Sequence, residues 1–145
     1  MKDLKKWRSA WFDIDVLTGQ QIREMAIVAA IVVNVIILVV GRLAIGEFPV
    51  ATAGEGERTV GFGQVILMTG MSGLIAWGLL AILERTTSRA KTIWTVIAVI
   101  AFLLSIVGPL DGGVDIASKV MLTLMHVGAA ATIIPLMRRT VATRP

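Results

Sequence analysis

Four long apolar segments, separated by short polar stretches, dominate the pattern of the chain. They cover about residues 25–45, 62–83, 92–107 and 116–137. Crossing a hydrocarbon core of about 30 Å takes about 20 helical residues at 1.5 Å each. We therefore predict an all-α, polytopic membrane protein with four transmembrane helices in an antiparallel bundle. The third span is short and is expected to stand nearly upright.

The composition indicates that lipid is the solvent of this chain. Of its 145 residues, 56% are hydrophobic and 17% are charged, whereas an average soluble domain is about 45–50% apolar. The net charge of +4 could indicate a nucleic-acid partner. The basic residues, however, cluster between the apolar segments, as membrane flanks do. We therefore expect a lipid bilayer as partner and no nucleic acid. The absence of cysteine excludes disulfides and thiolate sites.

The distribution of lysine and arginine predicts the orientation in the membrane. Eleven of the 14 basic residues lie in the N-terminal segment, the second connecting loop or the C-terminal end. The opposite side holds only Arg42, Arg58 and Lys119. The positive-inside rule then places both termini in the cytoplasm. The expected organisation is a cytoplasmic segment 1–24, a membrane domain 25–138 and a cytoplasmic tail 139–145.

The N-terminal segment is expected to form an interfacial amphipathic helix on the cytoplasmic surface. Trp7 and Trp11 are four residues apart among lysines, so they would share one helical face at the headgroups. A solvated tail and a helix that docks a partner are the alternatives. Thr18 and Gln21 form a predicted capping box that starts the first span. The first apolar segment is longer than a signal-peptide core, so we expect it to be retained.

Three polar residues, Asn34, Ser72 and His126, lie near the middle of their spans and therefore at a similar depth. His126 is the only histidine of the chain. An unpaired amide or imidazole in hydrocarbon costs several kcal/mol, so these side chains should face the bundle interior. Two interpretations follow. The one we favour is a hydrogen-bonded clasp between three helices; the other is a binding site at the midplane.

A second set of polar residues is expected at the outer mouth, the non-cytoplasmic end of the last span. The connecting loops on that side are acidic and are expected to be flexible. Asp115 and Lys119 are four residues apart and are predicted to form a salt bridge, with ligand capture as the alternative. The predicted outer-mouth charges are Arg42, Asp111, Asp115 and Lys119.

The sequence offers little for catalysis or cofactor binding. A proton-coupled transporter would depend on His126 alone, because no Asp or Glu lies within a span. Glu84, at the cytoplasmic edge, is expected to pair with Arg85, Arg138 or Arg139. Haem or zinc sites need further protein ligands that a single histidine does not supply. We therefore expect no metal, no cofactor, no catalytic residues and no enzymatic activity.

Small residues are expected to bring the helices close together. In the last span Gly128 and Thr132 are four residues apart and would make one close contact. In the second span the same role is expected of Gly61, Gly63, Gly70, Gly73 and Gly78.

The second half of the chain carries stretches that resemble one known family. They are WGLLAILER (77–85), IWT (93–95), LLSIVGP (103–109), read as a turn, and LMHVGAAATIIP (124–135). The most specific piece is the Met-His pair a few residues before a proline. These residues resemble an uncharacterised actinobacterial family of four-helix integral membrane proteins, a domain of unknown function, over roughly residues 34–138. The resemblance implies a multi-pass protein of the bacterial cytoplasmic membrane, and it implies no activity.

Together these observations predict a small integral membrane protein that is a structural or accessory component of a membrane assembly. Its partner would be another membrane protein or a second copy of the chain. The alternative is a binding or transport module for a small molecule or lipid, in which Asn34, Ser72 and His126 line a midplane pocket. A pocket that reaches His126 would favour the second function, and an imidazole closed off and bonded to Asn34 or Ser72 would favour the first.

Overall fold

The computed structural model describes residues 18–47, 49–52 and 56–141. Trp7, Trp11 and the predicted interfacial helix lie outside the described residues. Four helical segments are long and apolar enough to cross a membrane, which suggests a multi-pass membrane protein. The elements are α2 (Gly19–Ile45), β1 (Pro49–Thr52), β2 (Gly56–Thr59), α3 (Phe62–Thr86), α4 (Ala90–Ser105), α5 (Val107–Gly112) and α6 (Ile116–Arg139).

The first helix starts at the predicted capping box, which is confirmed. The Thr18 hydroxyl accepts from the Gln21 amide at 3.3 Å, and the Gln21 side-chain oxygen accepts from the Thr18 amide at 2.9 Å. Helix α2 therefore begins at Gly19, before the predicted start of the span at Met25. It ends at Ile45 and is capped by Gly46, whose φ of 89° is a conformation that favours glycine.

The third span is longer than the predicted segment 92–107, because α4 continues into α5. Together they form a segment of 23 residues from Ala90 to Gly112. Pro109 has no amide hydrogen to donate to Ser105, and its ring crowds that carbonyl, so the regular helix is interrupted at Ile106. The expected Gly-Pro turn is therefore wrong: the proline marks a break inside a span.

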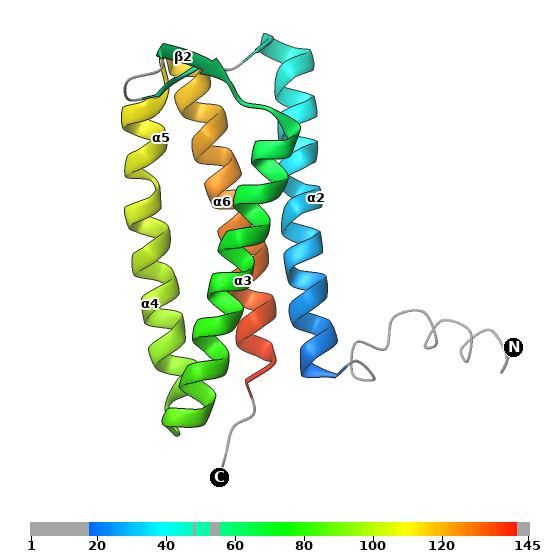
Figure 1. Ribbon diagram of the computed structural model, residues 1–145, viewed down its shortest axis with the longest axis vertical. Coiled ribbons are helices and arrows are strands. Elements are labelled where there is room, and N and C mark those ends of the chain that lie inside the picture. Colours follow the sequence, from blue (N-terminus) through cyan, green and yellow to red (C-terminus); the bar gives the residue numbers. More distant parts are fainter. Residues whose placement is uncertain (1–17, 48, 53–55, 142–145) are drawn as a thin grey trace, which may run out of the picture.

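The connection between α2 and α3 forms a β-hairpin, where the sequence indicated only a flexible acidic loop. Strands β1 and β2 are antiparallel, with Pro49 opposite Thr59. The hairpin lies at the end of the helices where α5 meets α6 (Figure 1). There Val50 forms a bridge with Gly113, and the Val114 amide donates to the Pro49 carbonyl oxygen at 3.4 Å. We call this the hairpin end, and the opposite end the terminal end.

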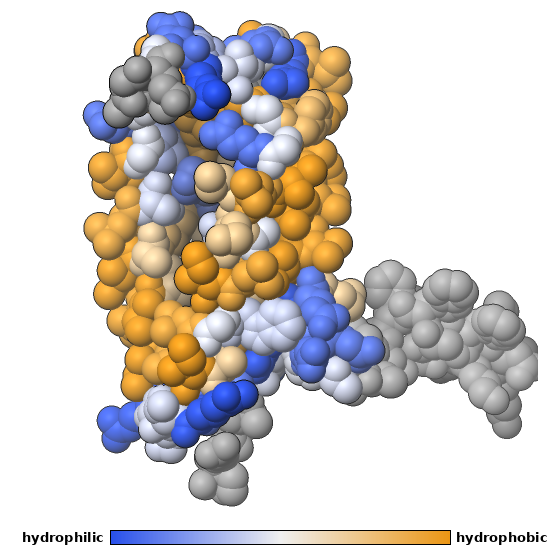
Figure 2. All heavy atoms as spheres, in the orientation of Figure 1, coloured by the Kyte–Doolittle hydropathy of each residue, from blue (hydrophilic) through white to orange (hydrophobic). Residues whose placement is uncertain are grey.

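The long helices lie side by side, with α2 against both α3 and α6, and α4 against α3 and α6 (Figure 1). Hydrophobic atoms cover the sides of the helices and hydrophilic atoms gather at both ends, as a bilayer requires (Figure 2). The buried apolar residues form two clusters. One lies toward the terminal end and includes Ala26, Ala30, Leu80, Trp94 and Met137; the other lies toward the hairpin end and contains Leu38, Val60, Val65 and Met125.

Trp94 fixes α4 to α3 in the terminal half. Its side chain is among the largest that are fully buried, at 1% exposure. A buried indole N–H requires an acceptor, and Nε1 donates to the Ala76 carbonyl oxygen of α3 at 2.9 Å. The two helices are therefore joined by both packing and a hydrogen bond at this level.

The glycines of α3 fulfil the predicted packing role at one position in particular. A Cβ atom on Gly73 would lie 2.7 Å from Cγ1 of Ile27 in α2, so only glycine fits there. A Cβ on Gly70 would make an ordinary 3.7 Å contact with Ile31. The prediction was wrong for the other three, since a Cβ would meet nothing within 4 Å at Gly61, Gly63 or Gly78.

The close contact predicted for Gly128 is confirmed in α6. A Cβ atom there would lie 2.9 Å from Cδ1 of Ile37 and 3.1 Å from Cγ1 of Val33, both in α2. Thr132 directs its hydroxyl back to the Gly128 carbonyl oxygen of its own helix, at 2.8 Å. The missing side chain of Gly128 is thus what allows α2 and α6 to approach closely.

Two matched substitutions in α3 test this packing. We expect Gly73→Ala to lower the free energy of unfolding by about 1–3 kcal/mol, because the added methyl group overpacks the contact with Ile27. Gly78→Ala adds the same atom in open space, so it should leave stability unchanged or raise it by up to about 1 kcal/mol through the higher helix propensity of alanine. Thermal unfolding in detergent measures both, and equal effects would contradict the proposed contact.

Candidate functional site

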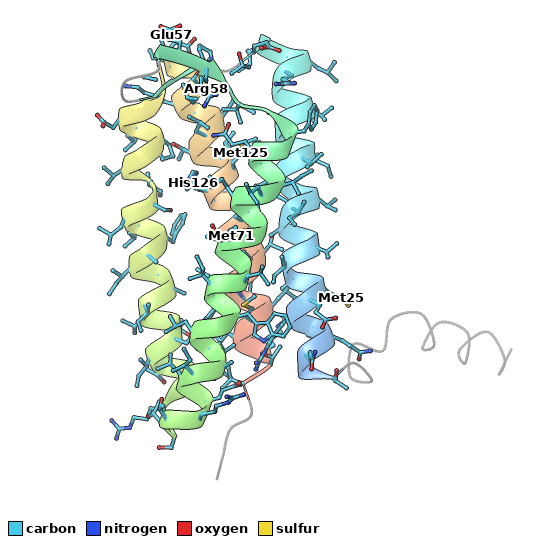
Figure 3. The ribbon with its side chains drawn as sticks, viewed as in Figure 1. Met25, Glu57, Arg58, Met71, Met125 and His126 are labelled. Atoms are coloured by element: carbon cyan, nitrogen blue, oxygen red, sulfur yellow. The ribbon has the colours of Figure 1, made fainter. Side chains whose placement is uncertain are left out.

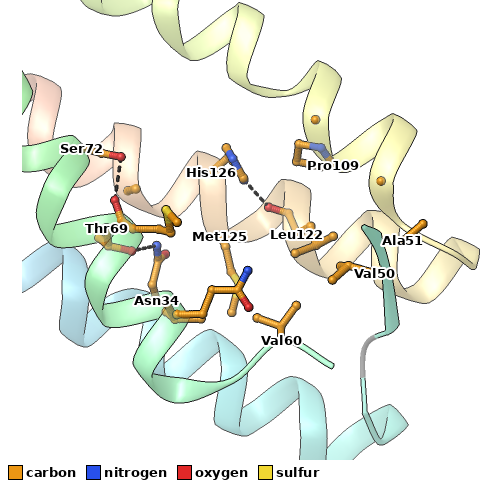
Figure 4. Close-up of a pocket in the computed structure, with 16 residues that line it drawn as sticks. Asn34, Val50, Ala51, Val60, Thr69, Ser72, Pro109, Leu122, Met125 and His126 are labelled. Carbon is orange, nitrogen blue, oxygen red and sulfur yellow. Dashed lines mark hydrogen bonds between the residues drawn. The ribbon is translucent and has the colours of Figure 1, made fainter. Parts of the chain in front are cut away.

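A cavity in the described structure lies in the hairpin half, among helices α2, α3, α5 and α6 and strand β1. Its volume is about 490 Å³. All three residues of the predicted polar layer, Asn34, Ser72 and His126, line it. The other walls are mainly apolar and include Val65, Met125 and Leu122 from the flanking helices (Figure 4). The sequence therefore predicted three residues that one cavity brings together.

Asn34 forms one wall of the cavity together with Thr69. Its Nδ2 donates to the Thr69 hydroxyl oxygen at 2.9 Å, and Asn34 is only 5% exposed (Figure 4). Its Oδ1 is buried and has no hydrogen-bond partner among the described residues. That oxygen faces Gly128, where an added Cβ would lie 3.3 Å away. The Asn34 amide thus holds α2 to α3 and keeps one acceptor unused.

His126 lies in the hairpin half of α6 and is partly buried (Figure 3). Its Nδ1 is 2.8 Å from the carbonyl oxygen of Leu122 in the same helix (Figure 4). We assign the ring hydrogen to Nδ1, because a carbonyl oxygen can only accept. In the neutral ring Nε2 then carries a lone pair, and no described residue donates a hydrogen bond to it.

The expected clasp between Asn34, Ser72 and His126 is wrong. The Ser72 hydroxyl donates to the Met68 carbonyl oxygen of its own helix at 2.7 Å, and His126 likewise bonds within α6. Asn34 bonds to Thr69, which lies about one turn from the expected partner. Counting residues from the ends of a helix gives the depth of a side chain but not the direction in which it points. The three residues share a cavity without bonding to one another.

The cavity opens sideways between α3 and the α4–α5 span. Gln64, Met68 and Ser72 line it at intervals of four residues along α3, and all three are exposed. Gly108 of α5 is exposed on the opposite wall. In Figure 2 a hollow with less hydrophobic atoms is visible between these helices, in the hairpin half. Both helical segments are long enough to span a membrane. The opening between them therefore faces sideways, away from the two ends of the helices.

Arg42, one of the predicted outer-mouth charges, is bound within the hairpin end. Its Nη2 donates to the Val60 carbonyl oxygen at 2.8 Å, and the same atom is 3.9 Å from Oε1 of Glu47. The guanidinium also lies 5.2 Å from the ring centroid of Phe62, within the range of a cation–π contact. Arg42 therefore ties the end of α2 to the segment that enters α3.

The other predicted outer-mouth residues do not form the expected ion pair. Asp115 is the N-cap of α6, and its Oδ1 accepts from the Ser118 amide at 2.6 Å. Asp115 and Lys119, both described, form no salt bridge, so that prediction was wrong. The carboxylate instead satisfies an unpaired amide at the helix start. Asp111 is exposed on α5 and pairs with none of the other three.

The terminal end holds an ion pair that the sequence reasoning missed. Glu84 accepts from Nη2 of Arg23 at 2.6 Å, and Nε of Arg23 donates to the Thr140 hydroxyl at 2.8 Å. The prediction that Glu84 pairs with Arg85, Arg138 or Arg139 was wrong. The sequence contained a signal for this pair. Arg23 lies at the start of the first span and Glu84 at the end of the second, so both lie at the terminal end. One guanidinium thus joins α2, α3 and the end of α6.

Comparison with known proteins adds a family but no activity. The profile of a family of unknown function (DUF6069) matches residues 18–143 of the chain. The matched range includes every residue that lines the cavity. No curated protein and no solved structure matches the chain. The predicted resemblance to a domain of unknown function is confirmed.

The N-cap of α6 predicts a pH dependence of stability. The Ser118 amide hydrogen bond holds the pKa of Asp115 below its ordinary value of 3.8. A carboxyl group whose pKa is lowered on folding stabilises the fold above its unfolded pKa and loses this effect as the pH falls through its folded pKa. Wild type should therefore melt above Asp115→Asn at pH 6, and this difference should shrink below about pH 3.8. A difference that grows on acidification in detergent melts would contradict the assignment.

Proposed function

Because the chain belongs to a family of unknown function, we propose its function from the geometry of the cavity. We infer that the protein is a non-enzymatic membrane protein that binds a small molecule or lipid there. The observation that supports this proposal is the convergence of Asn34, Ser72 and His126 on one cavity of about 490 Å³. Ligand pockets of roughly 300–1,000 Å³, with mostly apolar walls and a few polar groups, are typical of small-molecule sites.

The hydrogen bonds favour binding over the structural function expected from the sequence. A clasp would have used the imidazole and the Ser72 hydroxyl to join helices. Instead both groups bond within their own helices, and both line the cavity. Helix pairing therefore does not account for their positions on the cavity wall. A polar group kept on a cavity wall at membrane depth is better explained by contact with a ligand.

The set of residues that line the cavity also supports a non-enzymatic function. Among the residues that line the cavity, His126 is the only one with an ionisable side chain. General acid–base chemistry usually requires a positioned partner for the second proton transfer. The lining supplies hydroxyls, amides and apolar groups for binding, which is sufficient to hold and orient a molecule.

We further propose that the four spans form an antiparallel bundle with both termini in the cytoplasm of a bacterium. The basic residues support this orientation, because they gather where α3 ends and α4 begins and at the end of α6: Arg85, Arg89, Lys91, Arg138 and Arg139. In this orientation the hairpin end is extracytoplasmic. The cavity would then lie in the outer half of the membrane.

A matched pair of substitutions on α6 tests ligand binding. Ala129 lines the cavity, whereas Ala131 is exposed on the same helix. We expect Ala129→Leu to remove any small molecule that co-purifies with the protein from native membranes, because the longer side chain occupies its space. Ala131→Leu should retain it. Native mass spectrometry of the two variants provides the measurement, and retention of the same bound mass in Ala129→Leu would contradict the proposed site.

The orientation can be tested by labelling single cysteines, because the chain has none of its own. Glu57 lies in β2 and Ser88 between α3 and α4, and both are exposed. We expect a membrane-impermeant thiol reagent to label Glu57→Cys in intact cells, and to label Ser88→Cys only after the membrane is opened. The reverse pattern would overturn the proposed topology.

A further inference from the structure

The polar groups of the cavity indicate which class of molecule it binds. Resting on the proposed function, we infer that the ligand is an uncharged amphiphile with a hydroxyl group that donates a hydrogen bond. The hydroxyl lies beside His126 and Ser72, and the apolar part lies along α3 and α5. The ligand enters from the lipid, through the opening between these two helices.

The hydrogen-bond inventory carries the first step, because His126 and Ser72 present acceptors to the cavity, whereas the Gln64 amide, which can also donate, lies about two turns away along α3. With its hydrogen on Nδ1, His126 offers Nε2 as an acceptor. The Ser72 hydroxyl already donates to Met68, which leaves the lone pairs of its oxygen. The Asn34 Oδ1 behind this wall is also an acceptor without a partner among the described residues. A ligand that donates a hydrogen bond complements this surface.

The charge of the lining carries the second step. The residues that form the cavity include amides, hydroxyls and one imidazole but no Asp, Glu, Lys or Arg. Bringing an ion to this depth without an opposite charge would be costly. A phosphate or ammonium headgroup is therefore a poor occupant. An uncharged hydroxyl loses less hydration and recovers a hydrogen bond to the imidazole.

The shape of the cavity carries the third step. The stretch of α3 from Gln64 to Ser72 that lines it spans about 12 Å, at 1.5 Å per residue. Opposite this wall, Gly108 and Gly112 of α5 contribute backbone in place of side chains. Val65, Met68 and Leu122 are among the apolar neighbours. Such a space fits a hydrocarbon chain or ring system better than a compact polar solute.

The route of entry follows from what covers the cavity. Val50 and Ala51 of β1 line its hairpin end, and the bridge from Val50 to Gly113 fixes the strand there. Access from water at this end is therefore restricted. Met68 of α3, in contrast, is 59% exposed beside the opening. An amphiphile dissolved in the adjacent leaflet can reach the cavity without crossing the hairpin.

Three probes with the same hydrocarbon chain separate these features: 1-tetradecanol, its methyl ether and tetradecyl phosphate. Purified protein in detergent is titrated with each, and the rise of its melting temperature is followed by intrinsic tryptophan fluorescence. We expect the alcohol to act at about a three- to tenfold lower concentration than the ether, as one additional hydrogen bond allows. The anionic phosphate should produce no rise.

Two variants test whether the preference for the alcohol over the ether depends on the proposed acceptors. His126→Leu should reduce the alcohol-to-ether ratio to about one, because it removes Nε2 while retaining an apolar wall. Ser72→Ala should lower the alcohol-to-ether ratio partially. If His126→Leu does not fold, the ratio measured for Ser72→Ala alone tests the inference. The inference is overturned if wild type shows no preference for the alcohol, if the phosphate binds best, or if neither variant that folds lowers the preference.

Ala129→Leu separates failure of this inference from failure of the proposed function. If the cavity binds ligands, this variant should abolish the response to both uncharged probes, and Ala131→Leu should not. Equal binding of alcohol and ether in wild type, both lost in Ala129→Leu, would retain the cavity and reject the hydroxyl class. An undiminished response in Ala129→Leu would reject the cavity itself.

Discussion

The ion pair between Arg23 and Glu84 holds the helices together at the terminal end, and the cavity lies in the opposite half. Because Arg23 also bonds to Thr140, one guanidinium fixes the ends of three helices. A partly buried pair of this kind is costly to break, since separation leaves a charge without a partner. Trp94 completes the closure by fixing α4 to α3 in the same half. The space that the helices leave unfilled therefore lies toward the hairpin.

That open half is compatible with a membrane because several of its polar groups are satisfied within their own helices. The hydroxyls of Ser72 and Thr123, and Nδ1 of His126, all bond to the carbonyl oxygen four residues earlier in their own helices. None of them needs a neighbouring helix to compensate for lost hydration. The side chains can therefore line a cavity while the helices remain stable, and the remaining lone pairs are available to a ligand.

The sequence predicts most of the fold and part of the site. Length and apolarity identified four spans, and depth along the helices placed Asn34, Ser72 and His126 at one level. Depth does not specify the direction of a side chain, so the partner of Asn34 was missed, and so was the cavity between the three. Pro109 was read as the end of a helix because its effect on Ser105 is local, whereas the continuation as α5 depends on tertiary packing. The hairpin was missed because its pairing forms only when α2 and α3 bring its strands together.

The break at Ile106 affects which substitutions the wall of the cavity can accept. It places Gly108 and Gly112 one turn apart on the wall of the cavity, where an added Cβ would meet nothing within 4 Å. The proposed acceptors stand on other helices, α2, α3 and α6. For the proposed ligand, substitutions on α5 would therefore alter the size that fits and leave the polar contacts intact. The room in the cavity and the polar groups that line it thus belong to separate segments of the chain.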